Sequence, residues 1–413
     1  MATFAQKKLY NLAWKPYPQL EIRLHSQVSK VFGAAFFKKL QRNPETNLNR
    51  LVLTNFRSYA ALRFEPQARR LVFAGPNGAG KTNLLEAASL LVPGRGLRGA
   101  RFAELARQGG AGGWAVAARF DNGLEIGTGA VEGAPERREF RLNGVKPRAQ
   151  SDVAEQFAAV WLTPQMDRLF TDTASGRRKF LDRLVVALEP FHAREIAAFE
   201  SASAQRNRLL AEPPYDAAWA VALEDAMARH AVAATAARAA LIARLNATLA
   251  AGAADPFPRV ALGLGCAIAQ RLQQAPALDV EDWLRAALAA ARHADAVAKS
   301  SGYGPQKADL LITDEAAGRP AALSSTGQQK AMLIGIVLGH AAMITAARGE
   351  APLLLLDEPL VHLDAPRRAA LFAALEKADF SAWLTGTDSE TFTGFDAAPY
   401  CVRDSALELL PGF

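Results

Sequence analysis

Cysteine is scarce in this chain, with only Cys266 and Cys401 among 413 residues. Disulfide frameworks and zinc sites need several cysteines at close spacings, so these two argue against both. Long hydrophobic runs are also missing: no stretch reads as the roughly 18 apolar residues that a membrane span requires. We therefore expect a reducing, cytoplasmic setting and no membrane segment.

Charge is nearly balanced outside the first 47 residues. Residues 1–47 hold eight Lys or Arg against two Glu, a net +6 of the whole chain's +7. The sequence pI of about 9.5 therefore does not by itself indicate a nucleic-acid partner for the body. A basic N-terminal extension and a mis-assigned start are both open. No methionine lies between Met1 and Met166, so a true start near Leu48 would need a non-ATG codon.

The chain is too long for one compact core of usual size, so we expect two lobes or a domain with a large insertion. The composition shifts to Ala, Leu, Arg and Glu at about residue 180 and returns to strand-like runs after residue 300. We predict a first part of an ATPase lobe at 48–180, an inserted helical arm domain at 181–300, and the completion of the lobe at 301–413.

Strand patterns dominate the first part. A strand-like pattern begins at Leu48, and residues 70–74 form a short apolar run before a glycine loop and a predicted helix at 83–91. Asp121-Asn122-Gly123 and Asn143-Gly144 are hairpin signals, because Asn-Gly tolerates the positive φ of tight turns. These signals predict an antiparallel sheet beside the glycine loop.

The middle part is helical. Apolar residues recur at steps of three and four from Trp219 to Leu245, which predicts one face of a helix over 216–251, on the order of 50 Å long. A projecting arm and a helical subdomain packed on the sheet are both open. Beyond it, runs at 310–312, 353–356 and 382–385 lack alternation, as in parallel strands covered on both faces.

The glycine loop satisfies the phosphate-loop (Walker A) pattern. Its backbone N–H groups and the following helix N-terminus are expected to hold phosphates. Lys81 should neutralise the β and γ oxygens of a nucleotide triphosphate, and Thr82 should give its hydroxyl to Mg²⁺. The predicted ATP-binding residues are Gly75, Pro76, Asn77, Gly78, Ala79, Gly80, Lys81 and Thr82.

Two adjacent acids end the apolar run Leu353–Leu356, in the form of a Walker B strand. Asp357 at the strand tip can hold Mg²⁺, and Glu358 can orient and deprotonate an attacking water. Two acids alone are usually a solvated strand end, but the phosphate loop favours function. We therefore predict Glu358 and Lys81 as catalytic residues.

Three further segments resemble loops of ABC-type ATPases. Ser325, Thr326, Gly327 and Gln328 precede an apolar helix and resemble the signature loop, which implies contact with ATP held by another subunit. A bare Ser-Thr-Gly is more often a helix cap. Gln165 resembles the Q-loop residue that reaches Mg²⁺, and Asp364 resembles the D-loop residue at a dimer interface.

The combined motifs closely resemble the RecF family of bacterial recombinational-repair ATPases, which is related to SMC and Rad50 heads. The resemblance runs from about Leu48 to the C-terminus and is carried by these segments: Asn55–Tyr59, Gly80–Ala87, Gly94–Arg98, Arg177–Asp182, Gly304–Pro305 and Ser325–Gly327. It implies an α/β fold, an ABC-type (SMC/Rad50-like) P-loop ATPase head with an antiparallel β lobe and an inserted α-helical arm.

The resemblance also implies a function. It implies a homodimer that forms on ATP and Mg²⁺, binds junctions of single- and double-stranded DNA at gaps, and works with RecO and RecR to load RecA. Hydrolysis would be weak and slow. The DNA-contact candidates are arginines that could equally be solubilising: Arg95, Arg98, Arg101, Arg137, Arg138 and Arg141.

The rival function is the ATPase of a membrane transporter, which shares the ABC-type fold. Such motors carry a switch-loop histidine. The stretch 382–388 has none, and Thr387 is the nearest polar candidate. The sequence therefore favours the repair ATPase.

Overall fold

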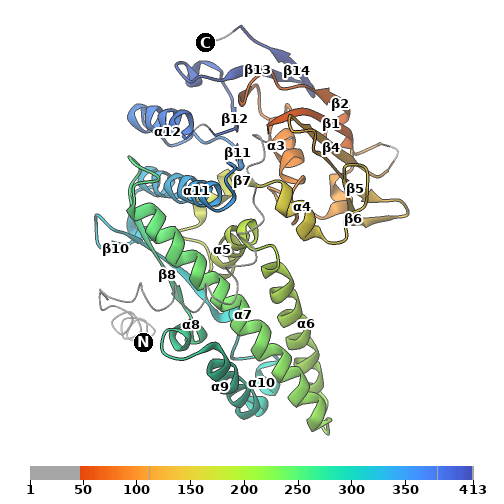
Figure 1. Cartoon of the computed structure of the whole chain (residues 1–413), viewed down its shortest axis with the longest axis vertical. Coiled ribbons are helices and arrows are strands. Elements are labelled where there is room, and N and C mark those ends of the chain that lie inside the picture. The colour runs from red at the N-terminus through yellow and green to blue at the C-terminus, as the bar shows by residue number, and fades with distance from the viewer. Residues whose placement is uncertain (1–46, 111, 379, 412–413) are drawn as a thin grey trace. The chain divides into compact units, whose positions relative to one another are not determined.

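The computed structural model describes residues 47–110, 112–378 and 380–411. The predicted basic extension, residues 1–47, lies outside the described residues except for Asn47. Element labels follow Figure 1.

A six-stranded sheet forms the centre of the lobe that carries the glycine loop, in the order β14-β13-β3-β12-β11-β7. β7, β11, β12, β3 and β13 run parallel, and β14 pairs antiparallel with β13 at the edge. Their bounds are Arg70–Ala74 (β3), Ala159–Leu162 (β7), Leu353–Leu356 (β11), Ala382–Gly386 (β12), Ala398–Arg403 (β13) and Ala406–Leu409 (β14). The parallel strands predicted at 353–356 and 382–385 are confirmed.

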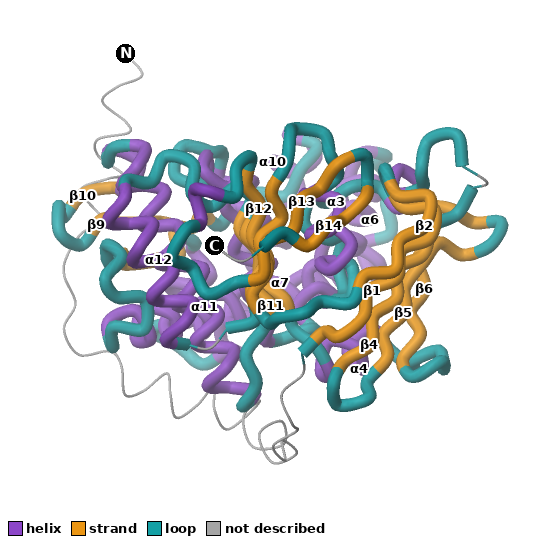
Figure 2. Tube along the Cα trace, turned by 90° about the horizontal axis from the view of Figure 1, so that it is seen from above, coloured by secondary structure: helices purple, strands orange, loops and turns teal. Residues whose placement is uncertain are grey.

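Helices bury both faces of this sheet, which is why its strands are continuous apolar runs. All four residues of β11 are buried. Figures 1 and 2 show α11 and α12 on one side of β11 and β12, with the antiparallel sheet on the other. Helix α3 (Lys81–Ser89) contacts β7, β11 and β12, and α11 (Thr326–Arg348) contacts β7. The other helices of this part of the chain are Gln150–Gln156 (α4), Ala174–Leu188 (α5) and Ala365–Lys377 (α12).

Helix α11 corrects one sequence expectation. By length and hydropathy its 23 residues could cross a membrane, so a run of that kind does exist. Within the protein, 78% of its apolar window is buried. Gly339 shows how closely it packs, because a Cβ there would lie 2.5 Å from the Leu249 side chain. In this structure α11 is a core helix.

A five-stranded antiparallel sheet, in the order β2-β1-β4-β5-β6, lies beside the central one. Its strands are Leu48–Phe56 (β1), Tyr59–Phe64 (β2), Ala115–Phe120 (β4), Glu125–Val131 (β5) and Ala134–Leu142 (β6). The hairpin predicted at Asp121–Gly123 is confirmed, since β4 and β5 pair across it.

The turn predicted at Asn143-Gly144 is present, but no long strand follows it in the described structure. Asn143 and Gly144 do turn with positive φ, but among the described residues only an isolated bridge from Leu142 to Val145 follows. The partner of β6 is β5, which it pairs with across a turn containing Gly133. A tight turn fixes a reversal of the chain, whereas pairing also needs a second strand long enough to bond.

The arm contains the long helix that the sequence predicted. Helix α7 spans Ala217–Ala250, and Asp216 caps it by accepting hydrogen bonds from the N–H groups of Ala218 and Trp219 at 2.8 and 3.2 Å. The other arm helices are His192–Ala211 (α6), Ala267–Leu272 (α8), Ala277–Ala290 (α9) and Arg292–Ala298 (α10).

Helix α7 belongs to two apolar cores. Leu223 and Met227 pack into a smaller core with α6 and α9, whereas Leu241 and Leu245 pack into the main core. The C-terminal half of α7 is therefore part of the main core, and its N-terminal half belongs to a separate, smaller core. Trp219, predicted on the buried face, is 49% exposed because the first turn of α7 extends beyond the smaller core.

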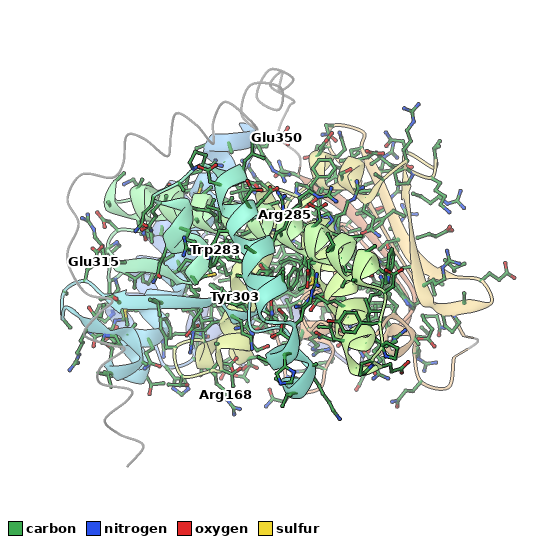
Figure 3. All side chains as sticks on the ribbon, turned by 90° about the horizontal axis from the view of Figure 1, so that it is seen from below. Arg168, Trp283, Arg285, Tyr303, Glu315 and Glu350 are labelled. Carbon is green, nitrogen blue, oxygen red and sulfur yellow. The ribbon has the colours of Figure 1, made fainter. Side chains whose placement is uncertain are left out.

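Two aromatic side chains pack against the smaller core. The rings of Trp283 in α9 and Tyr303 meet edge to face at a centroid distance of 5.8 Å, and both are labelled in Figure 3. Such pairs add to the apolar burial of a small core.

The strand predicted at 310–312 is not parallel. It is β9 (Asp309–Asp314), which pairs antiparallel with β8 (Val260–Gly265) and with the short β10 (Arg319–Pro320). Leu311 is 45% exposed between buried Leu310 and Ile312, so the strand alternates after all. Because leucine occurs on both the buried and the exposed face of β9, the alternation could not be seen in the sequence. The predicted boundary at residue 300 lies between β8 and β9, so paired strands cross it.

Candidate nucleotide site

The phosphate loop has a backbone that suits glycine. Gly75, Gly78 and Gly80 have φ of 153°, 83° and 110°, a region that other residues rarely adopt. At Gly75 a Cβ would also lie 2.3 Å from the carbonyl oxygen of Val402 in β13. The loop therefore stays closely packed against the sheet while Pro76, Asn77 and Gly78 are exposed.

Lys81 supplies a buried positive charge inside this loop. Its side chain is 5% exposed, and Nζ donates to the carbonyl oxygens of Gly75 and Pro76 at 2.7 and 3.0 Å. Desolvation lowers the pKa of Lys81, and the nearby carboxylates of Glu358 and Asp357 oppose that shift. An ammonium group held in a loop of amide donors suits a polyanion such as a triphosphate.

Two of the three predicted magnesium residues, Thr82 and Asp357, meet at the sheet edge. Thr82 Oγ1 donates to Asp357 Oδ1 at 2.9 Å, although 275 residues separate them. Hydroxyl and carboxylate oxygens are the donors that Mg²⁺ takes, usually with one or two carboxylates plus phosphates and water. In the described part of the chain, no group of three or more His, Cys, Asp or Glu is placed so that it could hold a metal ion by itself.

Thr385 completes this cluster and was missed by the sequence prediction. Its Oγ1 donates to Asp357 Oδ1 at 2.8 Å and accepts from the Glu358 N–H at 2.9 Å. Thr385 is 1% exposed, whereas the predicted candidate Thr387 is exposed. The register of β12 against β11 explains why Thr385 and not Thr387 reaches Asp357. Leu384 lies beside Leu356, so the next residues, Thr385 and Asp357, also lie side by side.

Glu358 has a left-handed backbone, with φ 50°, directly after the Walker B strand. Such a conformation is uncommon for a residue with a side chain and persists only where its surroundings hold it. The bond from its N–H to Thr385 is one such restraint.

The first prediction concerns Thr385. Thr385→Val keeps the shape of the side chain but removes both bonds that orient Asp357 and Glu358. We expect the apparent affinity for Mg²⁺ and the ATP turnover to fall about 10- to 100-fold, as for other partners of metal-binding groups. Magnesium titrations of ATP turnover would measure both.

Two controls accompany this variant. Thr385→Ser retains the hydroxyl and should restore most of the loss, and Thr387→Ala should behave like the wild type. Equal turnover of Thr385→Val and the wild type at low Mg²⁺ would contradict the role.

The signature loop lies next to the D-loop of the same molecule. Ser325 is exposed and caps α11 by accepting from the Gln328 N–H at 3.4 Å. A Cβ at Gly327 would lie 3.2 Å from both the His362 carbonyl oxygen and Arg367 Nη1. Across the described ranges, no hydrogen bond joins Ser325, Thr326, Gly327 or Gln328 to the phosphate loop.

The D-loop and Q-loop residues are exposed as well. Asp364 caps α12 by accepting from the Arg367 N–H at 3.0 Å, and its side chain is 56% exposed. Gln165 lies in a 3₁₀ turn, η3 (Pro164–Arg168), that follows β7. Asp167 in that turn pairs with buried Lys330 of α11 at 2.8 Å, which ties the Q-loop segment to the signature helix.

Comparison with known proteins identifies the family. Residues 47–394 match the family model described as RecF/RecN/SMC N terminal domain. The chain is 47% identical over 355 residues to the DNA replication and repair protein RecF of Mesorhizobium japonicum, covering 84% of this chain and 93% of the relative. The chain belongs to the RecF family. The RecF of Rhizobium leguminosarum bv. trifolii is 40% identical over 370 residues, covering 88% and 99%.

A solved structure agrees with the RecF-family fold. It is that of the recombination mediator protein RecF-ATPrS in the RecFOR pathway, with a TM-score of 0.79 and 20% identity, covering 89% of this chain and 99% of that one. The predicted fold, an ABC-type head of the SMC and RecF kind, is confirmed.

A pocket of about 550 Å³ adjoins the phosphate loop of this RecF-family chain. One wall is the loop itself, Pro76 to Ala79, and the other is the β13–β14 turn, Arg403 to Ser405. The Ser405 N–H donates to the Ala79 carbonyl oxygen at 3.3 Å. This turn was not predicted from the sequence, because only the pairing of β13 with β3 brings it to the loop.

One of the arginines suggested for DNA differs from the rest. Arg138 lies over the rings of Phe102 and Phe140, at 4.9 and 4.3 Å from their centroids, and donates to the Leu90 carbonyl oxygen. Burial lowers its pKa to about 10. Arg138 therefore packs within the fold, which corrects its assignment to an open surface. The other five are exposed: Arg95, Arg98, Arg101, Arg137 and Arg141.

Proposed function

We propose that this protein is an ATP-dependent DNA-binding protein of recombinational repair. The observation that carries the proposal is the meeting of Lys81, Thr82, Asp357 and Glu358 around one loop, in a chain 47% identical to a RecF protein. The loop and lysine would hold the phosphates of ATP, and the oxygens of Thr82 and Asp357 would hold Mg²⁺.

Each chain would supply half of two shared nucleotide sites. The signature residues lie at the start of α11, where Ser325 is exposed and Gly327 is half-buried, and neither makes a hydrogen bond to its own phosphate loop in the described part of the chain. Leu323 and Val361 beside them are 66% and 45% exposed. Exposed apolar side chains next to ATP-sensing loops fit a surface that a second copy covers. ATP would then hold a homodimer together.

Hydrolysis would release that dimer slowly. Glu358 would take a proton from water as the water oxygen bonds to the γ-phosphorus and the bond to the bridging β–γ oxygen breaks, giving ADP and phosphate. Mg²⁺ would neutralise the charge on the phosphate oxygens. The role of Thr385 is to hold Asp357 and the Glu358 backbone in position.

The dimer would bind DNA at junctions of single- and double-stranded regions, in the cytoplasm. Work with RecO and RecR to load RecA belongs to the same proposal and rests on the family. A transporter motor has no observation in its favour here, and the switch position is filled by Thr385 bonded to Asp357.

DNA binding should depend on both ATP and salt. A gapped duplex should show a mobility shift with ATP and Mg²⁺ but none without nucleotide, and the affinity should fall as salt rises because phosphate contacts release counterions. Arg95→Ala combined with Arg101→Ala should lower the slope of log affinity against log salt by about two.

Arg319→Ala is the matched control, since it removes an exposed charge from β10. It should bind like the wild type. A shift of equal strength with and without ATP would contradict the proposed ATP-dependent clamp.

A further inference from the structure

A second pocket lies away from the phosphate loop. It adjoins β7, the strand that precedes the turn with Gln165. Its volume is about 60 Å³, larger than the roughly 10–15 Å³ that a single water needs. Its walls come from the end of α4, from β7 and η3, and from α5 and α11. The lining is mostly apolar and includes Phe157, Trp161 and Phe180.

An arginine without an acidic partner lines this pocket. The Arg183 guanidinium lies 5.5 Å from the Trp161 ring centroid and 6.0 Å from that of Phe180. Its hydrogen bond goes to Met166 Sδ at 3.7 Å, a weak and neutral acceptor. No carboxylate of the described residues pairs with it. Burial lowers its pKa to about 10, so the group is still a cation at neutral pH.

Two buried rings in the lining have nitrogen atoms without partners in the described structure. Trp161 is 8% exposed, and its Nε1–H has no acceptor. His340 is 1% exposed; its Nε2 bonds the Leu184 carbonyl oxygen at 3.0 Å, while Nδ1 has no partner. Burial lowers the pKa of His340 to about 4, so the ring is neutral and Nε2 carries the proton. Buried polar atoms are usually bonded, and those left over call for an explanation.

The other arginine of the lining serves as an internal comparison. Arg348 donates to the carbonyl oxygens of Ala154 and Ala187 at 2.7 and 2.5 Å, and therefore has backbone partners. Arg183 combines a cation with aromatic faces and lacks such partners. This combination is complementary to an apolar group that carries an anion.

We propose that this pocket is a binding site for a small apolar carboxylate. The ring or chain of the ligand would lie among Phe157, Trp161 and Phe180, and its carboxylate would pair with Arg183. Met166 of η3 and His340 of α11 line the same pocket. An occupant would therefore contact both the Q-loop segment and the signature helix, the elements already joined by the Asp167–Lys330 pair.

Benzoate is a suitable probe, with benzamide as its neutral counterpart. Binding would be measured by saturation-transfer NMR titration on the full chain without nucleotide, so the result does not depend on ATP binding. A ligand of this size should bind in the millimolar range. We expect benzamide to bind at least tenfold more weakly than benzoate.

Arg183→Met tests the cation, because methionine keeps an apolar chain against Trp161 and Phe180. We expect benzoate to lose at least tenfold in affinity and its advantage over benzamide to disappear. Arg168→Met is the matched control: Arg168 is exposed on η3, is labelled in Figure 3 and does not line the pocket. It should bind benzoate like the wild type, and thermal unfolding would verify that both variants are folded.

Three results would overturn the proposal. These are the absence of benzoate binding to the wild type, equal binding of benzoate and benzamide, and equal loss in the Arg168 and Arg183 variants. None of them bears on the proposed ATPase, which is measured separately by phosphate release.

Discussion

Replacing Ser325 with arginine should abolish ATP-dependent dimerisation and leave the ATP affinity of a single subunit unchanged. Ser325 is exposed at the start of α11 and makes no hydrogen bond to the phosphate loop within the described residues. In the proposed dimer it faces the γ-phosphate held by the other copy. A long cationic side chain there would fill the space that the nucleotide and its loop must occupy.

Light scattering at saturating ATP and Mg²⁺ measures the mass, and a fluorescent-nucleotide titration measures the affinity. Ser325→Ala is the matched control: it loses the same helix cap, which costs about 1 kcal/mol, but adds no bulk or charge. It should still dimerise, though more weakly. A wild-type mass that stays that of one chain would contradict the shared site itself, and a dimer of Ser325→Arg would exclude the signature loop from it.

Replacing Glu358 with glutamine should reduce ATP hydrolysis by at least about 100-fold while keeping ATP binding and dimerisation. The amide has nearly the same shape but cannot accept the proton of the attacking water. The backbone bond to Thr385 and the pair formed by Thr82 and Asp357 do not involve the changed atoms. The ATP-bound dimer should therefore form and then persist longer than that of the wild type.

Phosphate release under single-turnover conditions, together with the decay of the dimer after dilution, measures both effects. Glu315→Gln, at an exposed turn between β9 and β10, is the control for losing one negative charge. Hydrolysis by Glu358→Gln at the wild-type rate would remove Glu358 as the base. A wild type that does not hydrolyse ATP would instead contradict the slow turnover in the proposed function.

Local motifs were predictable because their chemistry depends on a few residues that are adjacent in the sequence. The glycine loop, the acid pair at 357–358 and the helix start near residue 216 each depend on neighbours in the chain. A left-handed turn needs glycine, and a cap needs a short polar side chain, wherever the segment lies. These features therefore agree between the sequence and the structure.

Residues that act through another strand were not predictable in this way. Thr385 is one of several threonines near the end of β12, and only its register beside Asp357 gives it two bonds to the acid pair. Arg138 was read as part of a basic surface, but its guanidinium lies against Phe102 and Phe140. The sequence shows that a residue is charged, but it does not show on which side of the sheet the side chain lies.

The sequence by itself determined which groups can bind phosphate, take a proton or end a helix, because these properties belong to single residues and their neighbours. Only the tertiary structure decided which groups meet. It placed Thr82 against Asp357 across 275 residues, and put Arg183 between aromatic rings without an acidic partner in the described chain. Strand register and side-chain packing determine these contacts. Both depend on the burial of the whole apolar core rather than on any local sequence pattern.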